Sequence, residues 1–239
     1  MPTRYTSGVS TRKKGHPFGE FPAPDPFRNV EYFNDFVTYD SHADQLDWTV
    51  TETGSATQAC SDGDGGLLLV TNASSDNDAS FQQIPKEFIT PAAGKKIWFT
   101  SRVKVSDATQ SDFIVGLHVT DTSPLSATDG IYFQKDDGDT NLDFYCQKDS
   151  SSGQLANAAI ATVADATFMK LDFYFDGYQF LYVYVDDVVK ATQNLLGGST
   201  PAVTDYLPDT DLSLGFGIQN GEAVAKTMTV DYIGVAKER

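Results

Sequence analysis

Alternation of apolar and polar residues with a period of two runs through most of this chain and limits the folds open to it. The pattern is clear in residues 169–175, 212–219 and 227–232. Successive side chains of a strand point to opposite faces, so this spacing predicts half-buried β-strands. No segment shows a helix of three turns. The chain is therefore predicted to be all-β, with one core that 239 residues can readily bury.

About twelve strands are expected, separated by turn signals such as Asp137-Gly138, Asp176-Gly177 and Gly197-Gly198. Short helical turns are expected only at residues 85–89 and 123–128. That many strands do not fit comfortably in one open sheet, so two packed antiparallel sheets are predicted. The expected strands are 30–37, 46–50, 66–71, 79–84, 97–105, 112–119, 130–135, 141–147, 167–175, 178–191, 211–219 and 226–236.

Two of these strands are apolar on both faces, at residues 66–70 and 178–185. A strand of this kind has no face suited to water. We expect both to lie centrally in a sheet, or beneath a covering arm or a partner chain.

Residues 1–29 differ from the rest and are interpreted as an extended N-terminal arm before a domain of residues 30–239. The arm contains five prolines, whose missing amide donors disfavour helix and sheet. It also carries five basic and two acidic residues, 5 − 2 = +3, which leaves 12 − 31 = −19 for the domain. Its phenylalanines are suited to pockets on a neighbouring subunit, or to packing back on its own domain.

The overall charge and hydropathy exclude several classes of function. A net charge of −16 disfavours nucleic-acid binding, because phosphates would be repelled. No stretch approaches the apolar length of a membrane span, and the N-terminus lacks the apolar core of a secretory signal.

Two cysteines, Cys60 and Cys146, leave a disulfide open, although two free thiols fit a reducing compartment better. Cys146 is expected to be buried on a strand face.

Two C-terminal segments resemble the concanavalin A-like and laminin-G-like jelly rolls. "FMKLDFYFDGYQFLYVYVDDVVKAT" is similar to a hairpin of that class, which turns at Asp-Gly and ends in Tyr-Val-Asp. "KTMTVDYIGVAKE" is similar to its last strand. The resemblance implies a two-sheet antiparallel jelly-roll sandwich over residues 30–236 and carries no function by itself.

A second resemblance covers nearly the whole chain and concerns head proteins of tailed bacteriophages. It rests on "RYTSGVS", "YFNDF", "DGDGGLLLVTNA", "VSDATQSD", "FQKDDGD" and "IQNGEAVAKTMTVDYIGVAKER". It implies a capsid decoration (cement) protein on the exterior of the virion, assembled in the cytoplasm of a bacterial host. Its partner would be the major capsid protein, and it would act as a homotrimer.

Under that interpretation the arm anchors the protein, since an extended aromatic segment can lie across a neighbour at low entropic cost. Basic side chains would meet acidic capsid surface while phenylalanines fill apolar recesses. The predicted capsid-binding residues are Arg4, Tyr5, Arg12, Lys13, Lys14, His16, Phe18, Phe21 and Phe27.

The alternative hypothesis is a lectin-like carbohydrate-binding module, either free-standing or on the exterior of a virion for host attachment. It predicts a sheet with a row of exposed aromatic side chains and leaves bound calcium open. Candidate sugar-stacking residues are Trp48, Tyr178 and Tyr206, although tyrosines on strands are more often structural.

Catalysis is not expected, and neither a metal nor another cofactor is predicted. Retaining glycoside hydrolases need two carboxylates about 5 Å apart, and none of the six glutamates belongs to such a cluster. Asp172 and Asp176 are four residues apart, but Asp176 opens a turn.

Of the three histidines, His118 fits a packing role. The Asp-rich segments 62–65, 74–80 and 135–143 offer calcium ligands, yet their residues are also those that form turns.

Overall fold

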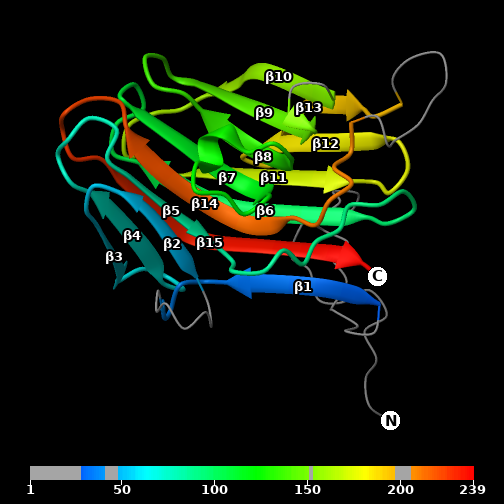
Figure 1. Ribbon diagram of the computed structural model, residues 1–239, viewed down its shortest axis with the longest axis horizontal. Coiled ribbons are helices and arrows are strands. Elements are labelled where there is room, and N and C mark those ends of the chain that lie inside the picture. Colours follow the sequence, from blue (N-terminus) through cyan, green and yellow to red (C-terminus); the bar gives the residue numbers. More distant parts are fainter. Residues whose placement is uncertain (1–27, 41–47, 151–152, 197–205) are drawn as a thin grey trace, which may run out of the picture.

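The computed structural model describes residues 28–40, 48–150, 153–196 and 206–239, which form two packed antiparallel sheets (Figure 1). The all-β jelly-roll sandwich predicted from the sequence is confirmed. A short 3₁₀ helix, Pro124–Ser126, lies in the segment where a helical turn was expected. In the described ranges no helix is long and apolar enough to cross a membrane.

The first sheet, sheet A, has eight strands. Seven follow one another across the sheet, and β1 pairs beside β15. In spatial order they are β13 (Val188–Asn194), β12 (Phe180–Val185), β11 (Met169–Phe175), β6 (Ile97–Val105), β15 (Thr227–Glu238), β4 (Leu67–Asn72) and β3 (Ala56–Ser61), with β1 (Asn29–Asn34).

The second sheet, sheet B, has seven strands. Their spatial order is β10 (Gly153–Thr162), β9 (Asn141–Lys148), β8 (Gly130–Lys135), β7 (Ser111–His118), β14 (Ser213–Asn220), β5 (Ala79–Gln83) and β2 (Thr49–Thr53). β2 is thus the edge strand next to β5, which matters for the site described below.

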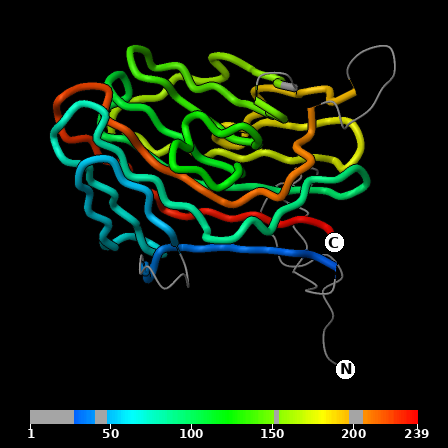
Figure 2. The backbone as a smooth tube through the Cα atoms, viewed as in Figure 1, coloured from blue at the N-terminus to red at the C-terminus, as the bar shows by residue number. Residues whose placement is uncertain are grey.

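β15 organises sheet A because both of its edges are used. One edge pairs with β6, and the other pairs first with β4 and then with β1. The register with β6 shifts between Val230 and Tyr232. The first and last strands of the domain therefore lie side by side (Figure 2). Residues 1–27 lie outside the described part, so the division into arm and domain stays a prediction.

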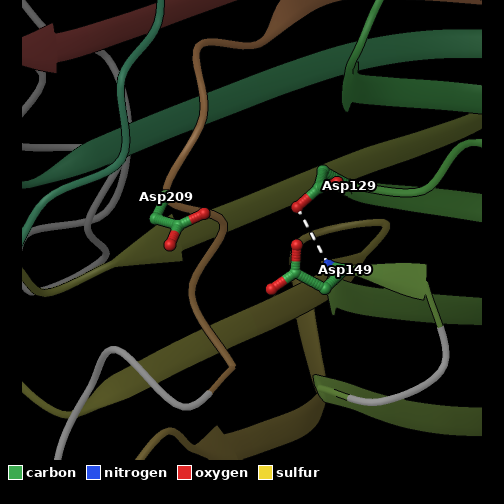
Figure 3. Close-up of side chains that lie close together, drawn as sticks. All are labelled: Asp129, Asp149 and Asp209. Carbon is green, nitrogen blue, oxygen red and sulfur yellow. Dashed lines mark hydrogen bonds between the residues drawn. The ribbon is translucent and has the colours of Figure 1, made fainter.

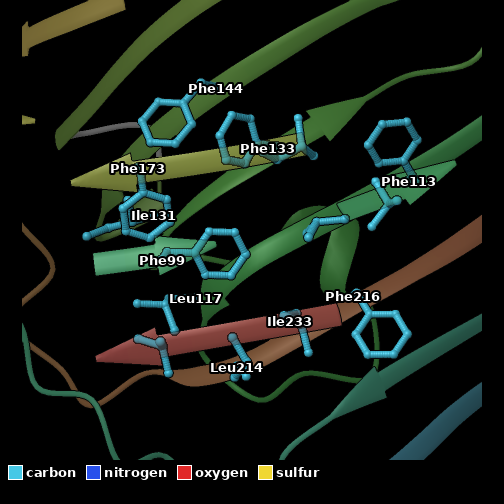
Figure 4. Close-up of a cluster of buried hydrophobic side chains, with 14 of the residues drawn as sticks. Phe99, Phe113, Leu117, Ile131, Phe133, Phe144, Phe173, Leu214, Phe216 and Ile233 are labelled. Carbon is cyan, nitrogen blue, oxygen red and sulfur yellow. The ribbon is translucent and has the colours of Figure 1, made fainter. Parts of the chain in front are cut away.

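Aromatic side chains from both sheets fill the space between them (Figure 4). Phe99 and Phe173 of sheet A stack with ring centroids 4.8 Å apart. Phe144 of sheet B lies 5.8 Å from Phe173 and 4.9 Å from Phe133. Each of these rings is fully buried. Aromatic pairs at such distances add to the stabilisation from the buried area alone, so this cluster fixes how the two sheets sit on each other.

The structure has strands that the alternation did not reveal. β3 and β10 were missed because their sequences, ATQACS and GQLANAAIAT, are rich in small residues and lack a clear apolar face. They form because β4 and β9 supply pairing partners. The single strand expected at 178–191 is two strands, β12 and β13, joined at Asp186-Asp187, where both residues have positive φ. Residues 85–89 are not helical.

The two strands predicted to be apolar on both faces are interior strands, but each lies only one position from an edge. β4 lies between β15 and β3, and β12 lies between β11 and β13. The outer side chains of β12 join a small aromatic cluster on the outer face of sheet A. Its members are Trp98, Tyr174, Tyr182, Tyr184 and Ala236.

The cysteines are not bonded to each other. Cys146 is buried in the core, as expected from its strand, and Cys60 is exposed on β3. Burial raises the pKa of the Cys146 thiol. This side chain therefore acts as a small apolar group in the core.

One buried ion pair ties the start of β15 to the loop before β7. Lys226 is almost fully buried, and its Nζ lies 2.7 Å from Asp107 Oδ2 and 2.6 Å from Glu222 Oε1. Asp107 Oδ1 also accepts hydrogen bonds from the amides of Thr109 and Gln110. The bond from Lys226 lowers the pKa of Asp107 to about 2.

The low pKa of Asp107 predicts a specific loss of stability in acid. Because the folded-state pKa is depressed, the stabilisation is complete above the unfolded value of about 4 and is lost as pH falls toward about 2. Asp107→Asn should lower the free energy of unfolding by about 1.5–3 kcal/mol at pH 7. It should also flatten the pH dependence between about pH 4 and pH 2. Urea unfolding at several pH values measures both, and an unchanged acid slope would contradict the assignment.

Candidate functional site

The loop between β7 and β8, residues 119–129, folds over the outer face of sheet B (Figure 1). Its ends are joined by a hydrogen bond of 3.1 Å from Val119 N to Asp129 O. Leu125, in the 3₁₀ helix, packs on an apolar cluster of this face. The cluster consists of Ala79, Phe81, Ile114 and Tyr132, with Leu125 and Tyr145 against it.

Glycines in the strands of sheet B make room for the rings of this cluster. A Cβ atom on Gly217 would collide with the ring of Phe81, and one on Gly130 would lie 2.7 Å from the ring of Tyr132. The rings therefore lie close to the backbone of the sheet. The resulting apolar surface gives the 119–129 loop a firm base.

A pocket of about 270 Å³ lies where this loop approaches the edge of sheet B. One wall comes from β2, another from β5 and the two residues after it, and the third from the start of the loop. The lining residues are Thr49, Thr51, Gln83, Ile84, Pro85, Thr120, Asp121 and Thr122. The pocket thus combines hydroxyl, amide and carboxylate groups with a small aliphatic surface.

Two side chains anchor the loop wall of the pocket. Gln83 is buried, and its Nε2 donates to Asp121 O over 2.7 Å while its Oε1 accepts from Asp121 N over 2.9 Å. Glu87 Oε1 accepts from both the amide and the hydroxyl of Thr120, over 2.8 and 2.9 Å. These bonds fix two consecutive loop residues, so the pocket is formed before any ligand arrives.

The carboxylate of Asp121 is itself held in place. Its Oδ1 accepts from Ser123 N over 2.8 Å and closes a tight turn in the loop. In the described part of the chain its Oδ2 has no hydrogen-bond partner. One carboxylate oxygen of a residue that lines the pocket is thus available as an acceptor.

His118, two residues before the pocket residue Thr120, is fully buried on the outer face of sheet B. Its Nδ1 donates to Val119 O over 2.9 Å, because a carbonyl can only accept. Burial lowers the pKa of His118, although the bond to Val119 and the charges of Asp121 and Glu87 act in the opposite direction. The ring is therefore neutral near pH 7 and does not line the pocket. The packing role predicted for this histidine is confirmed.

Three carboxylates gather at one end of sheet B (Figure 3). Oxygens of Asp129, Asp149 and Asp209 lie within 4.8 Å of one another, and no other such group of acidic, His or Cys residues occurs in the described ranges. Asp149 N donates to Asp129 over 3.1 Å. The ammonium group of Lys148 lies 2.6 Å from Asp209 and lowers its pKa. Lysine therefore already supplies positive charge to this cluster.

Two of the three Asp-rich segments weighed for calcium, 74–80 and 135–143, behave as turns. Asp78 Oδ2 accepts from Ser75 N over 2.9 Å, and Asp139 Oδ1 accepts from Asn141 N over 2.7 Å. Their carboxylates thus satisfy nearby amides of their own loops. This agrees with the turn interpretation of these residues.

The predicted sugar-stacking residues have different environments. Trp48 is only 1% exposed and packs in the core against Phe36 and Phe216, so its assignment as an exposed platform is wrong. Tyr206 is half-buried. Tyr178 is 70% exposed, in the turn after β11. None of the three lines the pocket.

The acidic pair considered for hydrolysis does not form a site. Asp172 is buried on the outer face of sheet A, 3.0 Å from Lys170 Nζ. Asp176 Oδ1 accepts from three backbone amides of its turn, as its position in the sequence indicated. No glutamate of the described part lines the pocket.

All nine residues predicted to bind a capsid fall within residues 1–27 and so lie outside the described part of the chain. They are Arg4, Tyr5, Arg12, Lys13, Lys14, His16, Phe18, Phe21 and Phe27. Conversely, the pocket residues were not identified from the sequence. The available signal was "TDTSP" at residues 120–124, an aspartate turn followed by proline, but nothing local placed it beside β2 and β5.

Anchoring by Gln83 predicts a local effect of Gln83→Leu. The change leaves the amide and carbonyl of Asp121 without these partners, so the free energy of unfolding should fall by about 1–3 kcal/mol. Hydrogen exchange at the Asp121 amide should accelerate. Gln219→Leu, on β14 of the same sheet, is a matched control because Gln219 makes only contacts of 3.3 Å. Unchanged protection of Asp121 in Gln83→Leu would show that another group holds the loop.

No protein-family model matches the chain, and no curated protein matches it by sequence. Solved structures do match. The endo-1,3-β-glucanase of Streptomyces sioyaensis aligns at 14% identity with a TM-score of 0.59, covering 90% of this chain and 98% of that one. The endo-β-1,4-glucuronan lyase of Trichoderma reesei aligns at 10% identity and TM-score 0.57, covering 85% and 94%.

The potassium-bound carbohydrate recognition domain of Emp46p also matches, at 9% identity and TM-score 0.55, with 84% of this chain and 94% of that chain covered. At such low identity these similarities show the fold alone. The chain is a jelly-roll sandwich of the concanavalin A-like kind.

Proposed function

We propose that this protein is a carbohydrate-binding module and that its saccharide site is the pocket between β2, β5 and the 119–129 loop. The observation that carries the proposal is the lining of that pocket. Hydroxyl, amide and carboxylate groups converge there beside Ile84 and Pro85 in a preformed cavity. Small-molecule sites typically combine a few oriented polar groups with an apolar surface.

The chemistry of the lining suits a sugar. Each sugar hydroxyl can donate and accept a hydrogen bond, and the hydroxyls of Thr49, Thr51 and Thr122 can do the same. Oδ2 of Asp121 can accept from a sugar hydroxyl, which forms a stronger, charge-assisted bond. Pro85 adds an aliphatic ring that suits the C–H face of a pyranose, while Ile84 beside it packs against the core.

Size and rigidity also fit. The volume of about 270 Å³ is just below the range of roughly 300–1,000 Å³ for small-molecule pockets. This is room for the end or one unit of a saccharide, with the rest lying on the open surface. Because Gln83 and Glu87 already hold the loop, binding does not have to order it, and less entropy is lost.

The pocket supports binding better than hydrolysis. Asp121 is the single carboxylate in its lining, whereas a glycosidase of the common type needs two carboxylates that flank the scissile bond. Glu87 is engaged with Thr120, and His118 is fully buried. The similar structures include a carbohydrate recognition domain, a glucanase and a lyase, so sugar binding is what their names share.

Blocking the pocket should abolish binding. Glycan-array screening of the full chain, followed by calorimetry on the best ligand, should detect a saccharide. Thr49→Tyr places a large side chain in the pocket while keeping a residue that favours strands. We expect it to weaken binding at least tenfold, while Thr53→Tyr, on the same exposed strand but outside the pocket, leaves it unchanged. Equal binding by both variants would show that the saccharide binds outside this pocket. An array on which no glycan binds the protein would contradict the proposal.

The second candidate is a structural role on a bacteriophage capsid, with the arm as anchor and the jelly roll displayed. The observation that favours it is the charge split between the +3 arm and the −19 domain. Display on a virion is compatible with sugar binding, because arm and pocket are different parts of the chain. The major capsid protein and a homotrimeric state belong to this second proposal.

Co-sedimentation with undecorated phage heads tests the capsid role. The full chain should pellet with the heads, and a chain that starts at Asn29, where β1 begins, should stay in the supernatant. Circular dichroism first confirms that both are folded. Pelleting of both chains would place the contact on the jelly roll, and pelleting of neither would remove the capsid proposal.

A further inference from the structure

We propose that the pocket selects uncharged saccharides and discriminates against saccharides that carry carboxylates, with Asp121 as the residue that determines this specificity. The inference rests on the proposed function and adds the chemical class of the ligand. It follows from the charges around the pocket and from the way its backbone amides are used.

Within the lining of the pocket the charge is of one sign. Asp121 is the only charged residue in the lining, and Glu87 stands directly behind Thr120. No lysine or arginine lines the pocket, and no ion pair recorded for the described residues includes Asp121 or Glu87. A ligand carboxylate would therefore lie near the negative charges of Asp121 and Glu87. The exposed Lys86 precedes Glu87 in the sequence, but no ion pair among the described residues joins it to either carboxylate.

The nearby histidine does not change this balance. His118 is close enough for Asp121 and Glu87 to act on it electrostatically, yet its burial outweighs their effect and keeps the ring neutral. Its Nδ1 proton is donated to Val119 O. His118 thus brings no positive charge to the pocket.

Three of the four amides from Thr120 to Ser123 are also unavailable to an anion. Successive free amides in a turn commonly bind carboxylate or phosphate. Here Thr120 N donates to Glu87, Asp121 N donates to Gln83, and Ser123 N donates to Asp121 Oδ1. These donors are used by the protein itself. What the pocket wall offers instead is the acceptor Asp121 Oδ2, which suits a hydroxyl or an amine.

A matched pair of ligands tests the inference. Cello-oligosaccharides and β-1,4-glucuronan oligosaccharides share one backbone and differ at C6, which is a hydroxymethyl group in one and a carboxylate in the other. Calorimetry with hexasaccharides of each should show that the wild-type protein binds the glucuronan at least about tenfold more weakly at low salt. Because the repulsion is screened by ions, the difference should shrink as salt is raised.

Asp121→Asn should lower the ratio of the glucuronan Kd to the cello-oligosaccharide Kd severalfold. Asparagine keeps an oxygen for Ser123 N, so the turn can remain while the charge is removed. Asp139→Asn is the matched control, since Asp139 makes the same bond to an amide two residues ahead in another exposed loop. The control should keep the wild-type ratio, and circular dichroism confirms that each variant is folded.

The outcomes separate the inference from the proposed function. Equal or tighter binding of the glucuronan by the wild type would overturn the inference and leave carbohydrate binding intact. A ratio that Asp121→Asn leaves unchanged would overturn the role of Asp121. Binding of neither series, nor of any neutral or amino saccharide on an array, would overturn the proposed function and the inference with it.

Discussion

Phe99 and Phe173 stack on neighbouring strands of sheet A, and Phe133 and Phe144 of sheet B pack against them. This aromatic contact spans the sandwich at β6, β8, β9 and β11. It sets the spacing of the two sheets, so the inward-facing side chains of all the remaining strands must fit that spacing. The outer face of sheet B is then free to carry a different kind of surface, since its strands are already held from within.

That outer face holds the 119–129 loop in a fixed position on the rigid core. Phe81 and Tyr132 lie against glycine positions of neighbouring strands, Leu125 rests on them, and Gln83 and Glu87 bond to the start of the same loop. Apolar packing fixes where the loop lies, and hydrogen bonds fix its backbone. A site built this way keeps its shape without a ligand, at the expense of adaptability.

The fold was readable from the sequence because alternation reports burial, and the strongest alternating segments, such as 212–219, became core strands. β3 and β10 were not readable, since their pairing depends on neighbours distant in sequence rather than on an apolar face of their own. The pocket was hidden for the same reason: Thr49 and Asp121 are far apart in the chain and meet only through sheet order. Trp48 shows the reverse error, because an aromatic residue beside an exposed edge strand proved to be core.

An aromatic row was the feature expected of a sugar-binding sheet, and sheet A does have one in Trp98, Tyr174 and Tyr182 on adjacent strands. Trp98 is only 6% exposed, so its face is not open to a ring. The pocket on sheet B relies on hydroxyls and a carboxylate instead. Stacking surfaces accept many sugars, whereas oriented hydrogen bonds reject a ligand that leaves them unpaired. The proposed site is therefore suited to selective recognition of a short saccharide segment rather than to broad adhesion to a polymer surface.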